Sequence, residues 1–187
     1  MAIIAVYFGF IGVAANLESE EIMSDNAVCD FSEIPEQSTS ECPCSPEIDW
    51  LDNEWRGIKI NLPETVQSSG GENGFLNSET TRVPVYLLLQ FTFDRLAKYD
   101  LEREGITLIF IDQKTGKSFV NNLFETNSSI PTEADEIPEE EMKVRVIRLY
   151  YNINALEYIE LPDNEATYDV YATFEEFKSN VMTVEMK

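Results

Sequence analysis

Short runs in which apolar and polar residues alternate constrain the fold of this chain more than any other feature. The strongest run, residues 83–93, places five apolar side chains on one face of an extended strand: Val85, Leu87, Leu89, Phe91 and Phe93. Residues 56–62 repeat this period of two, and Pro63 ends the run. Because a period of two is the pattern of a half-buried β-strand, the chain is predicted to be all-β.

Turn signals separate the further strands that the sequence predicts. Residues 106–111 are apolar on both faces, as in a central strand, and residues 118–122 return after a hairpin turn in which Gly116 supplies a positive φ. The remaining predicted elements are an edge strand at residues 143–151, a short helical turn at 155–159, and a final hairpin of residues 167–174 and 180–186. About seven strands at this spacing favour an antiparallel sandwich over residues 50–187.

The last forty residues carry the most specific pattern. The segment from Leu161-Pro162 to Tyr168 resembles the tyrosine corner of immunoglobulin-like and fibronectin type III-like domains. The resemblance implies an antiparallel sandwich of this type, with the Tyr168 ring buried and its hydroxyl bonded to the backbone of the 161–167 turn. Alternation after Tyr168 places Val170, Ala172 and Phe174 on the same face as its ring. The final hairpin also resembles the ends of uncharacterised bacterial exported proteins.

The first fifteen residues predict export. They form an apolar run shorter than the roughly 20 residues that span a bilayer. The run ends in Val13-Ala14-Ala15, which resembles the small residues before a signal-peptidase cut. We therefore expect residues 1–15 to be a signal peptide, the mature chain to lack a transmembrane span, and the protein to be periplasmic or extracellular. The alternative is that residues 3–8 form a buried first strand.

Residues 16–49 predict an acidic, largely flexible segment before the sandwich. They contain no Lys or Arg, and their apolar residues follow no period. Three cysteines lie here, namely Cys29, Cys42 and Cys44, and no cysteine follows them. Because the disulfide that joins the two sheets of antibody domains is therefore absent, a fibronectin-like variant, or another cysteine-free relative, is the better match. Export permits a disulfide from Cys29 to Cys42 or Cys44, which leaves one cysteine over; the alternative is redox or metal chemistry at Cys42-Pro43-Cys44.

The charge and the missing histidines exclude several functions. Thirteen Lys and Arg stand against thirty-five Asp and Glu, which gives a net charge of −22, and there is no histidine. Such a chain repels phosphate backbones, so no nucleic-acid partner is expected. Nucleophile pairs with histidine and histidine metal ligands are excluded. Residues 68–71 contain two glycines but lack the ending of a phosphate-binding loop.

The remaining candidate sites are acidic or aromatic. Asp163 and Glu165, together with the acidic residues of 133–141, are the candidate calcium ligands, and no other cofactor is expected. Trp50, Trp55 and Tyr171 are candidates for stacking on a sugar or anchoring a protein, although both tryptophans could instead cover the bottom of the core.

The function predicted from these features is a non-catalytic, exported sandwich module that binds a protein or a glycan or has a structural role. The alternative is a small hydrolase or carbohydrate-active accessory protein that works through carboxylates. The sequence indicates no oligomeric state.

Overall fold

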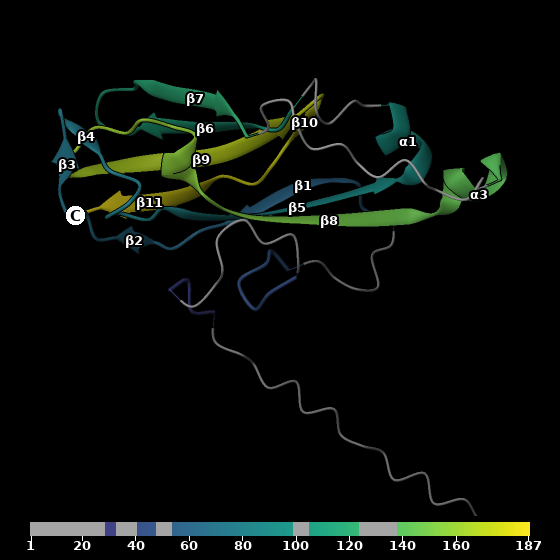
Figure 1. Cartoon of the computed structure of the whole chain (residues 1–187). Helices are drawn as coiled ribbons and strands as arrows, with labels where there is room; N and C mark the ends of the chain where they lie inside the picture. Colours follow the sequence, from purple (N-terminus) through teal and green to yellow (C-terminus); the bar gives the residue numbers. More distant parts are fainter. Residues whose placement is uncertain (1–28, 33–40, 48–53, 99–104, 124–137) are drawn as a thin grey trace, which may run out of the picture.

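The computed structural model describes residues 29–32, 41–47, 54–98, 105–123 and 138–187, and these are mostly β-strands (Figure 1). Seven of the described strands have five or more residues: β1 Gly57–Asn61, β5 Pro84–Thr92, β6 Thr107–Asp112, β7 Ser118–Asn122, β8 Val146–Asn154, β9 Ala166–Phe174 and β11 Met182–Met186. The shorter elements are β2 Thr65–Val66, β3 Gly71–Glu72, β4 Phe75–Leu76, α1 Phe93–Lys98, α3 Glu139–Val144, the 3-10 turn η1 Ala155–Glu157 and β10 Phe177–Lys178. The prediction of an all-β chain is confirmed.

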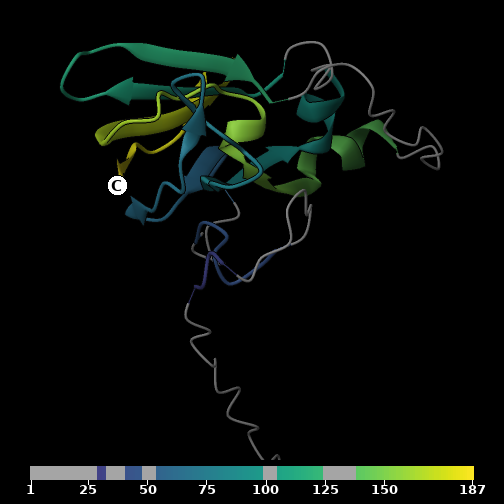
Figure 2. The same ribbon diagram turned by 60° about the vertical axis from the view of Figure 1, so that its left-hand side comes forward.

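Two sheets form the layers of the molecule. The smaller sheet has the order β1-β5-β8, and the larger has the order β2-β11-β9-β6-β7, with β10 paired to β9. All pairings in these sheets are antiparallel except that of β11 with β2. Figures 1 and 2 show β6, β7 and β9 in one layer and β1, β5 and β8 in the other. The β3–β4 pair forms a separate small hairpin.

The core lies between the sheets, and the predicted strand faces line it. Val85, Leu87, Leu89 and Phe91 of β5 are all fully buried, and so are Tyr168, Val170 and Ala172 of β9. The Phe91 and Phe174 rings meet across the layers with centroids 5.7 Å apart. Full burial of one such side chain stabilises a fold by about 1.5–3 kcal/mol, so facing rows of this kind hold the two sheets together.

The structure adds three features that the sequence analysis did not predict. The second face of β5 is also buried, since Tyr86, Leu88 and Gln90 are at most 3% exposed. The predicted loop at residues 67–77 contains the β3–β4 hairpin, which is bonded to Leu161 through the Leu76 amide. Phe93 begins α1 rather than ending the strand. Each feature depends on a neighbour that is distant in the sequence.

Several predictions concern residues outside the described part of the chain. These are the signal peptide at 1–15, Trp50, most of the acidic segment 16–49, and the acidic residues before 138. Among the described residues, no helix has the length and apolar character needed to cross a bilayer.

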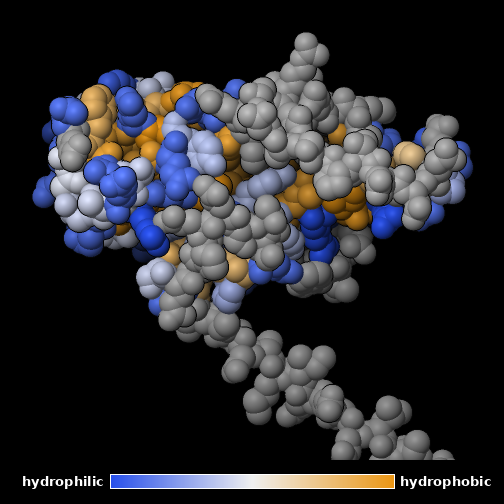
Figure 3. Space-filling view, viewed as in Figure 1, coloured by the Kyte–Doolittle hydropathy of each residue, from blue (hydrophilic) through white to orange (hydrophobic). Residues whose placement is uncertain are grey.

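Figure 3 shows hydrophobic residues in the region of β6, β7 and β9, bordered by hydrophilic ones.

Candidate functional site

The outer face of the larger sheet carries an apolar row that runs across four neighbouring segments. The strand register places Ile109 of β6 opposite both Val120 of β7 and Tyr171 of β9. Because Val181 precedes Met182, which is opposite Val170, it continues the row beside Tyr171. Val120 is 55% exposed and Val181 is 52% exposed. We call Val120, Ile109, Tyr171 and Val181 the apolar row.

Polar side chains with partners border the apolar row. Asp169 accepts hydrogen bonds from Gln113 Nε2 at 2.6 Å and from Thr183 Oγ1 at 3.0 Å. On the other side, Thr107 Oγ1 donates to Asn122 Oδ1 at 2.7 Å. An apolar centre inside a polar rim is the usual composition of a protein-binding patch.

The ring of Tyr171 is covered on one side by a cation. Lys178 Nζ lies 3.8 Å from the centre of this ring, which is a close cation–π contact. Tyr171 points away from the core, as its place between buried Val170 and Ala172 predicts. This aromatic candidate is therefore available from the outer face, but one face of its ring is already occupied.

The outer face of the smaller sheet is covered by the N-terminal strap, by which we mean described residues 29–32 and 41–47. The Phe31 ring lies 5.4 Å from the Tyr86 ring. Asn61 Nδ2 donates to the Cys44 carbonyl at 3.0 Å, and Lys59 Nζ donates to the Glu47 carbonyl at 3.0 Å. The Phe31 contact explains why Tyr86, on the second face of β5, is buried. The described parts of the acidic segment thus pack on the sheet, outside the core between the layers.

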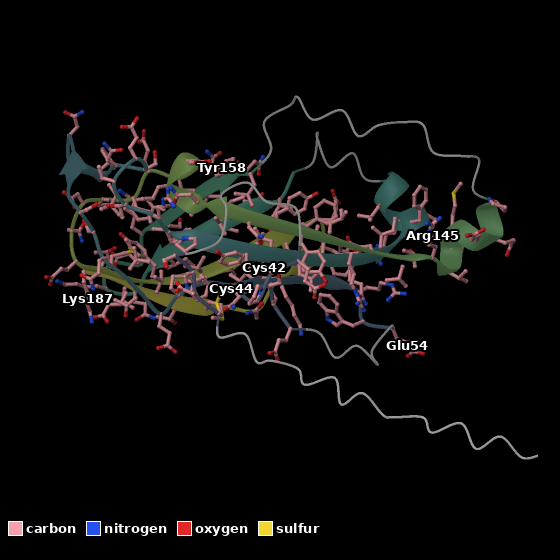
Figure 4. The ribbon with its side chains drawn as sticks, turned by 60° about the horizontal axis from the view of Figure 1, so that its bottom comes forward. Cys42, Cys44, Glu54, Arg145, Tyr158 and Lys187 are labelled. Atoms are coloured by element: carbon pink, nitrogen blue, oxygen red, sulfur yellow. A yellow bond between two sulfur atoms is a disulfide. The ribbon has the colours of Figure 1, made fainter. Side chains whose placement is uncertain are left out.

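A disulfide closes the N-terminal strap. Cys29 is bonded to Cys44, with 4.7 Å between their Cα atoms, and Cys42 is free. Figure 4 shows Cys42 and Cys44 in front of the strand ribbons. The Cys42 thiol lies 3.5 Å from Ser45 Oγ and 3.8 Å from Asn152 Nδ2. The structure therefore selects the second of the two pairings that the sequence left open.

Beside the free thiol lies a cavity of about 390 Å³ between the strap and the sheet, lined by Cys42, Leu88, Arg148 and Tyr150 among others. Burial under the strap raises the pKa of Tyr86 to about 12, and negative charge at Cys42 and Asp30 acts in the same direction. The described residues of the strap therefore bury Tyr86 and border this cavity.

Trp55 lies on this outer face and not over the core. Its ring lies against the exterior side of Gly57, and Lys59 Nζ is 5.4 Å from its centre. The interpretation that Trp55 covers the bottom of the core is therefore wrong. Its carbonyl accepts a hydrogen bond from the buried Gln90 side chain at 2.8 Å, and Gln90 Oε1 accepts one from Arg148 Nε at 2.6 Å. Trp55 thus belongs to a bonded polar network that fixes its position.

Tyr168 is fully buried, but its hydroxyl does not make the predicted bond. The ring makes edge contacts with Phe110 and Phe119, with centroids 5.9 and 6.0 Å away. No group among the described residues is within hydrogen-bond reach of the hydroxyl. The predicted bond to the 161–167 turn is wrong because the aromatic contacts hold the ring inside the core. Burial raises the pKa of Tyr168 to about 12, assisted by the negative charge of Asp112.

The other two predicted structural residues lie near the ends of the sandwich. Leu161 is fully buried, and its carbonyl accepts a bond from the Leu76 amide at 2.9 Å. Gly116 has a φ of +70° and closes the β6–β7 turn through a 2.8 Å bond from its amide to the Asp112 carbonyl. Both residues therefore shape connections between strands.

Among the described candidate calcium ligands, Asp163 and Glu165 do not join a metal site. Asp163 uses both carboxylate oxygens to hold the loop before β3, accepting bonds from the Gly71 amide at 2.8 Å and from Ser68 Oγ at 3.1 Å. Glu165 lies at the rim of an open depression that also includes Lys187. Within the described ranges, no group of three or more Asp, Glu, Cys or His side chains is placed to hold a metal ion.

Sequence reasoning found Tyr171 but missed the rest of the apolar row. The outward positions of each strand could be read from alternation, but Val120, Ile109 and Val181 become neighbours only through the strand register. Comparisons with protein-family models, curated proteins and solved structures gave no match. The function is therefore inferred from the two sheet faces themselves.

Proposed function

We propose that this chain is an exported, non-catalytic immunoglobulin-like sandwich module, of the fibronectin-like variant, that binds a basic protein partner through the apolar row. The strand connectivity supports the fold assignment. In the immunoglobulin scheme, β1, β5 and β8 correspond to strands A, B and E, and β6, β7, β9 and β11 correspond to C, C′, F and G. The Cys29–Cys44 disulfide supports an oxidising compartment, such as the periplasm or the cell exterior.

The apolar row is the observation that carries the binding proposal. It places two half-exposed valines and an aromatic ring on one flat face, where desolvation by a partner would be favourable. The partner is expected to be basic, because a net charge of −22 attracts cationic surfaces and repels anionic ones. A protein is favoured over a glycan because Lys178 already covers one face of the Tyr171 ring, which a sugar would need for stacking.

Photo-crosslinking tests this proposal directly. A crosslinking amino acid placed at position 181 should capture a discrete basic protein from the exported fraction of the native host. Unlabelled parent chain should compete with the capture, whereas the Tyr171→Ser variant should compete at least ~tenfold less well. The captured complex should also weaken as salt increases, since its attraction is partly electrostatic.

Val144 provides a matched control, because it is a 72% exposed valine on α3, away from the apolar row. A crosslinker at position 144 should capture nothing that the parent chain competes for, and Val144→Ser should compete as well as the parent. Equal capture at positions 144 and 181 would contradict the proposal. Glycan binding that is lost in Tyr171→Ala but retained in Val181→Ser would replace the protein partner by a glycan.

A further inference from the structure

In the part of the chain that the structure describes, β7 is the outermost strand of the larger sheet, and its outer edge has no strand partner. In the order β2-β11-β9-β6-β7 it pairs with β6, and no other described strand pairs with it. Figures 1 and 2 show β7 at the outer margin of the molecule. Ser118, Val120, Asn121 and Asn122 are all exposed. A strand in this position presents unpaired backbone groups to any chain that can lie beside it.

The hydrogen bonds at the two ends of β7 show which backbone groups face outward. The Lys117 carbonyl accepts from Asp112, and the Leu123 amide donates to Ile106, so both residues bond toward β6. Because this direction alternates along an antiparallel strand, the backbone groups of Ser118, Val120 and Asn122 face the open side. The Asn122 amide is already bonded to Asn121 Oδ1 at 2.9 Å, which leaves the amides of Ser118 and Val120 and all three carbonyls.

The sequence of this edge lacks the usual protection against pairing. Residues 118–122 contain no proline and no charged residue, which are two of the features with which natural edge strands prevent association. The nearest charged residue in the sequence is Lys117, whose Nζ lies 4.6 Å from the centre of the Phe119 ring. The outward side chain at the middle of the strand is that of Val120.

We propose that β7 pairs antiparallel with β7 of a second copy of this chain, so that the two larger sheets become one continuous sheet. A twofold axis at Val120 places Val120 opposite its own copy and Ser118 opposite Asn122 of the other chain. This register gives four new backbone hydrogen bonds: two between the Val120 residues, and two from the Ser118 amides to the Asn122 carbonyls. The facing side chains are all uncharged.

A second copy suits this edge because Val120 is the middle residue of β7. Twofold pairing therefore places the two exposed Val120 side chains opposite each other and pairs both strands along their whole length. Isologous contacts of this kind are the commonest route to a closed dimer. The pairing also joins the two apolar rows end to end, since Val120 is the last residue of each row. Each copy carries a charge of −22, so repulsion should weaken the dimer at low salt and screening should strengthen it.

Sedimentation of the chain over a range of concentrations, at low and at high ionic strength, tests the dimer. The parent should form dimers that increase with concentration and with salt, which is opposite to the salt response expected for the basic partner. Val120→Lys should raise the dimer dissociation constant at least ~tenfold. Val181→Lys is the matched control, because it makes the same charge change on a valine of similar exposure away from the edge, and it should dimerise like the parent.

Cysteine crosslinking tests the register, in a background where Cys42 is replaced by Ser. Val120→Cys should form a symmetric intermolecular disulfide, because directly opposed, hydrogen-bonded residues have Cα atoms about 5.5 Å apart. Ser118→Cys should not, because Ser118 faces Asn122. A parent that stays monomeric at high concentration and high salt would overturn the proposal, and so would equal crosslinking at positions 118 and 120. A dimer without a captured partner would leave this inference standing and remove only the proposed function.

Discussion

Replacing Tyr168 by Phe removes a buried hydroxyl that has no described partner, and we expect the variant to be at least as stable as the parent. A buried polar group without a hydrogen bond costs about 1–3 kcal/mol of folding free energy. Removal of the oxygen should therefore raise the free energy of unfolding by about 1 kcal/mol, with about 3 kcal/mol as an upper limit. A tyrosine corner predicts the opposite, namely that Tyr168→Phe lowers the free energy of unfolding because a hydrogen bond is lost.

The ring itself should remain essential. Tyr168 contacts Phe110 and Phe119 edge-on, and its side chain is fully buried. Tyr168→Ala removes these contacts and leaves a cavity, which should cost about 3–5 kcal/mol. This variant shows that the assay detects a loss at this position, so a neutral or favourable result for Tyr168→Phe has a clear meaning.

Alkaline pH gives a second measurement of the same environment. The pKa of Tyr168 is raised from 10.0 to about 12 by burial, so the folded state holds the proton more tightly than the unfolded state. The stabilising contribution of protonated Tyr168 is present in full below pH about 10 and is lost as the pH rises toward about 12. A pKa shift of this size corresponds to a loss of roughly 2–3 kcal/mol in the free energy of unfolding across this pH range. Tyr168→Phe should lose less stability over this window, and Tyr86, with a pKa also near 12, should supply much of the remaining dependence.

Urea unfolding followed by circular dichroism, at neutral pH and again near the upper end of this window, compares the parent with Tyr168→Phe and Tyr168→Ala. The expected result is a higher unfolding midpoint for Tyr168→Phe with an unchanged dependence on urea. A loss of about 1 kcal/mol or more at neutral pH would refute the reasoning, because it would mean that the hydroxyl makes a hydrogen bond in the folded protein.

Further substitutions test three features: the β6–β7 turn, the strap and the buried polar network. Gly116→Ala should lower the free energy of unfolding by about 1–2 kcal/mol, measured by thermal unfolding, because a φ of +70° is unfavourable for alanine. No atom lies within 4 Å of the added Cβ, so a steric clash does not contribute to this cost. A neutral result would mean that the turn is not left-handed. Cys29→Ser breaks the disulfide, so it should expose residues 41–47 to proteases and lower the free energy of unfolding by at most about 3 kcal/mol for a 15-residue loop. Cys42→Ser removes only the free thiol and should change neither the digestion nor the stability. Unaltered digestion of Cys29→Ser would contradict a strap held by the disulfide. Gln90→Leu should cost about 1–3 kcal/mol because it removes the bonds to the Trp55 carbonyl and Arg148, and a stabilised variant would show that the network is dispensable.

Local patterns in the sequence determined the strands, their facing and one turn. The alternation from Tyr168 to Phe174 and from Val85 to Phe91 predicted which side chains enter the core, because a period of two is a property of the extended backbone itself. The β6–β7 hairpin was equally local, since Gly116 supplies a conformation that other residues rarely adopt.

Only the tertiary structure decided which strand faces are covered and which side chains meet. Tyr86 and Leu88 were readable as outward residues of β5, but their burial depends on the strap, which reaches them from more than forty positions away through Cys44 and Phe31. The apolar row, the place of Trp55 and the bare hydroxyl of Tyr168 likewise arise from contacts between distant segments. Such contacts depend on strand register and on the packing of separate layers, and neither can be predicted from the period of a single strand.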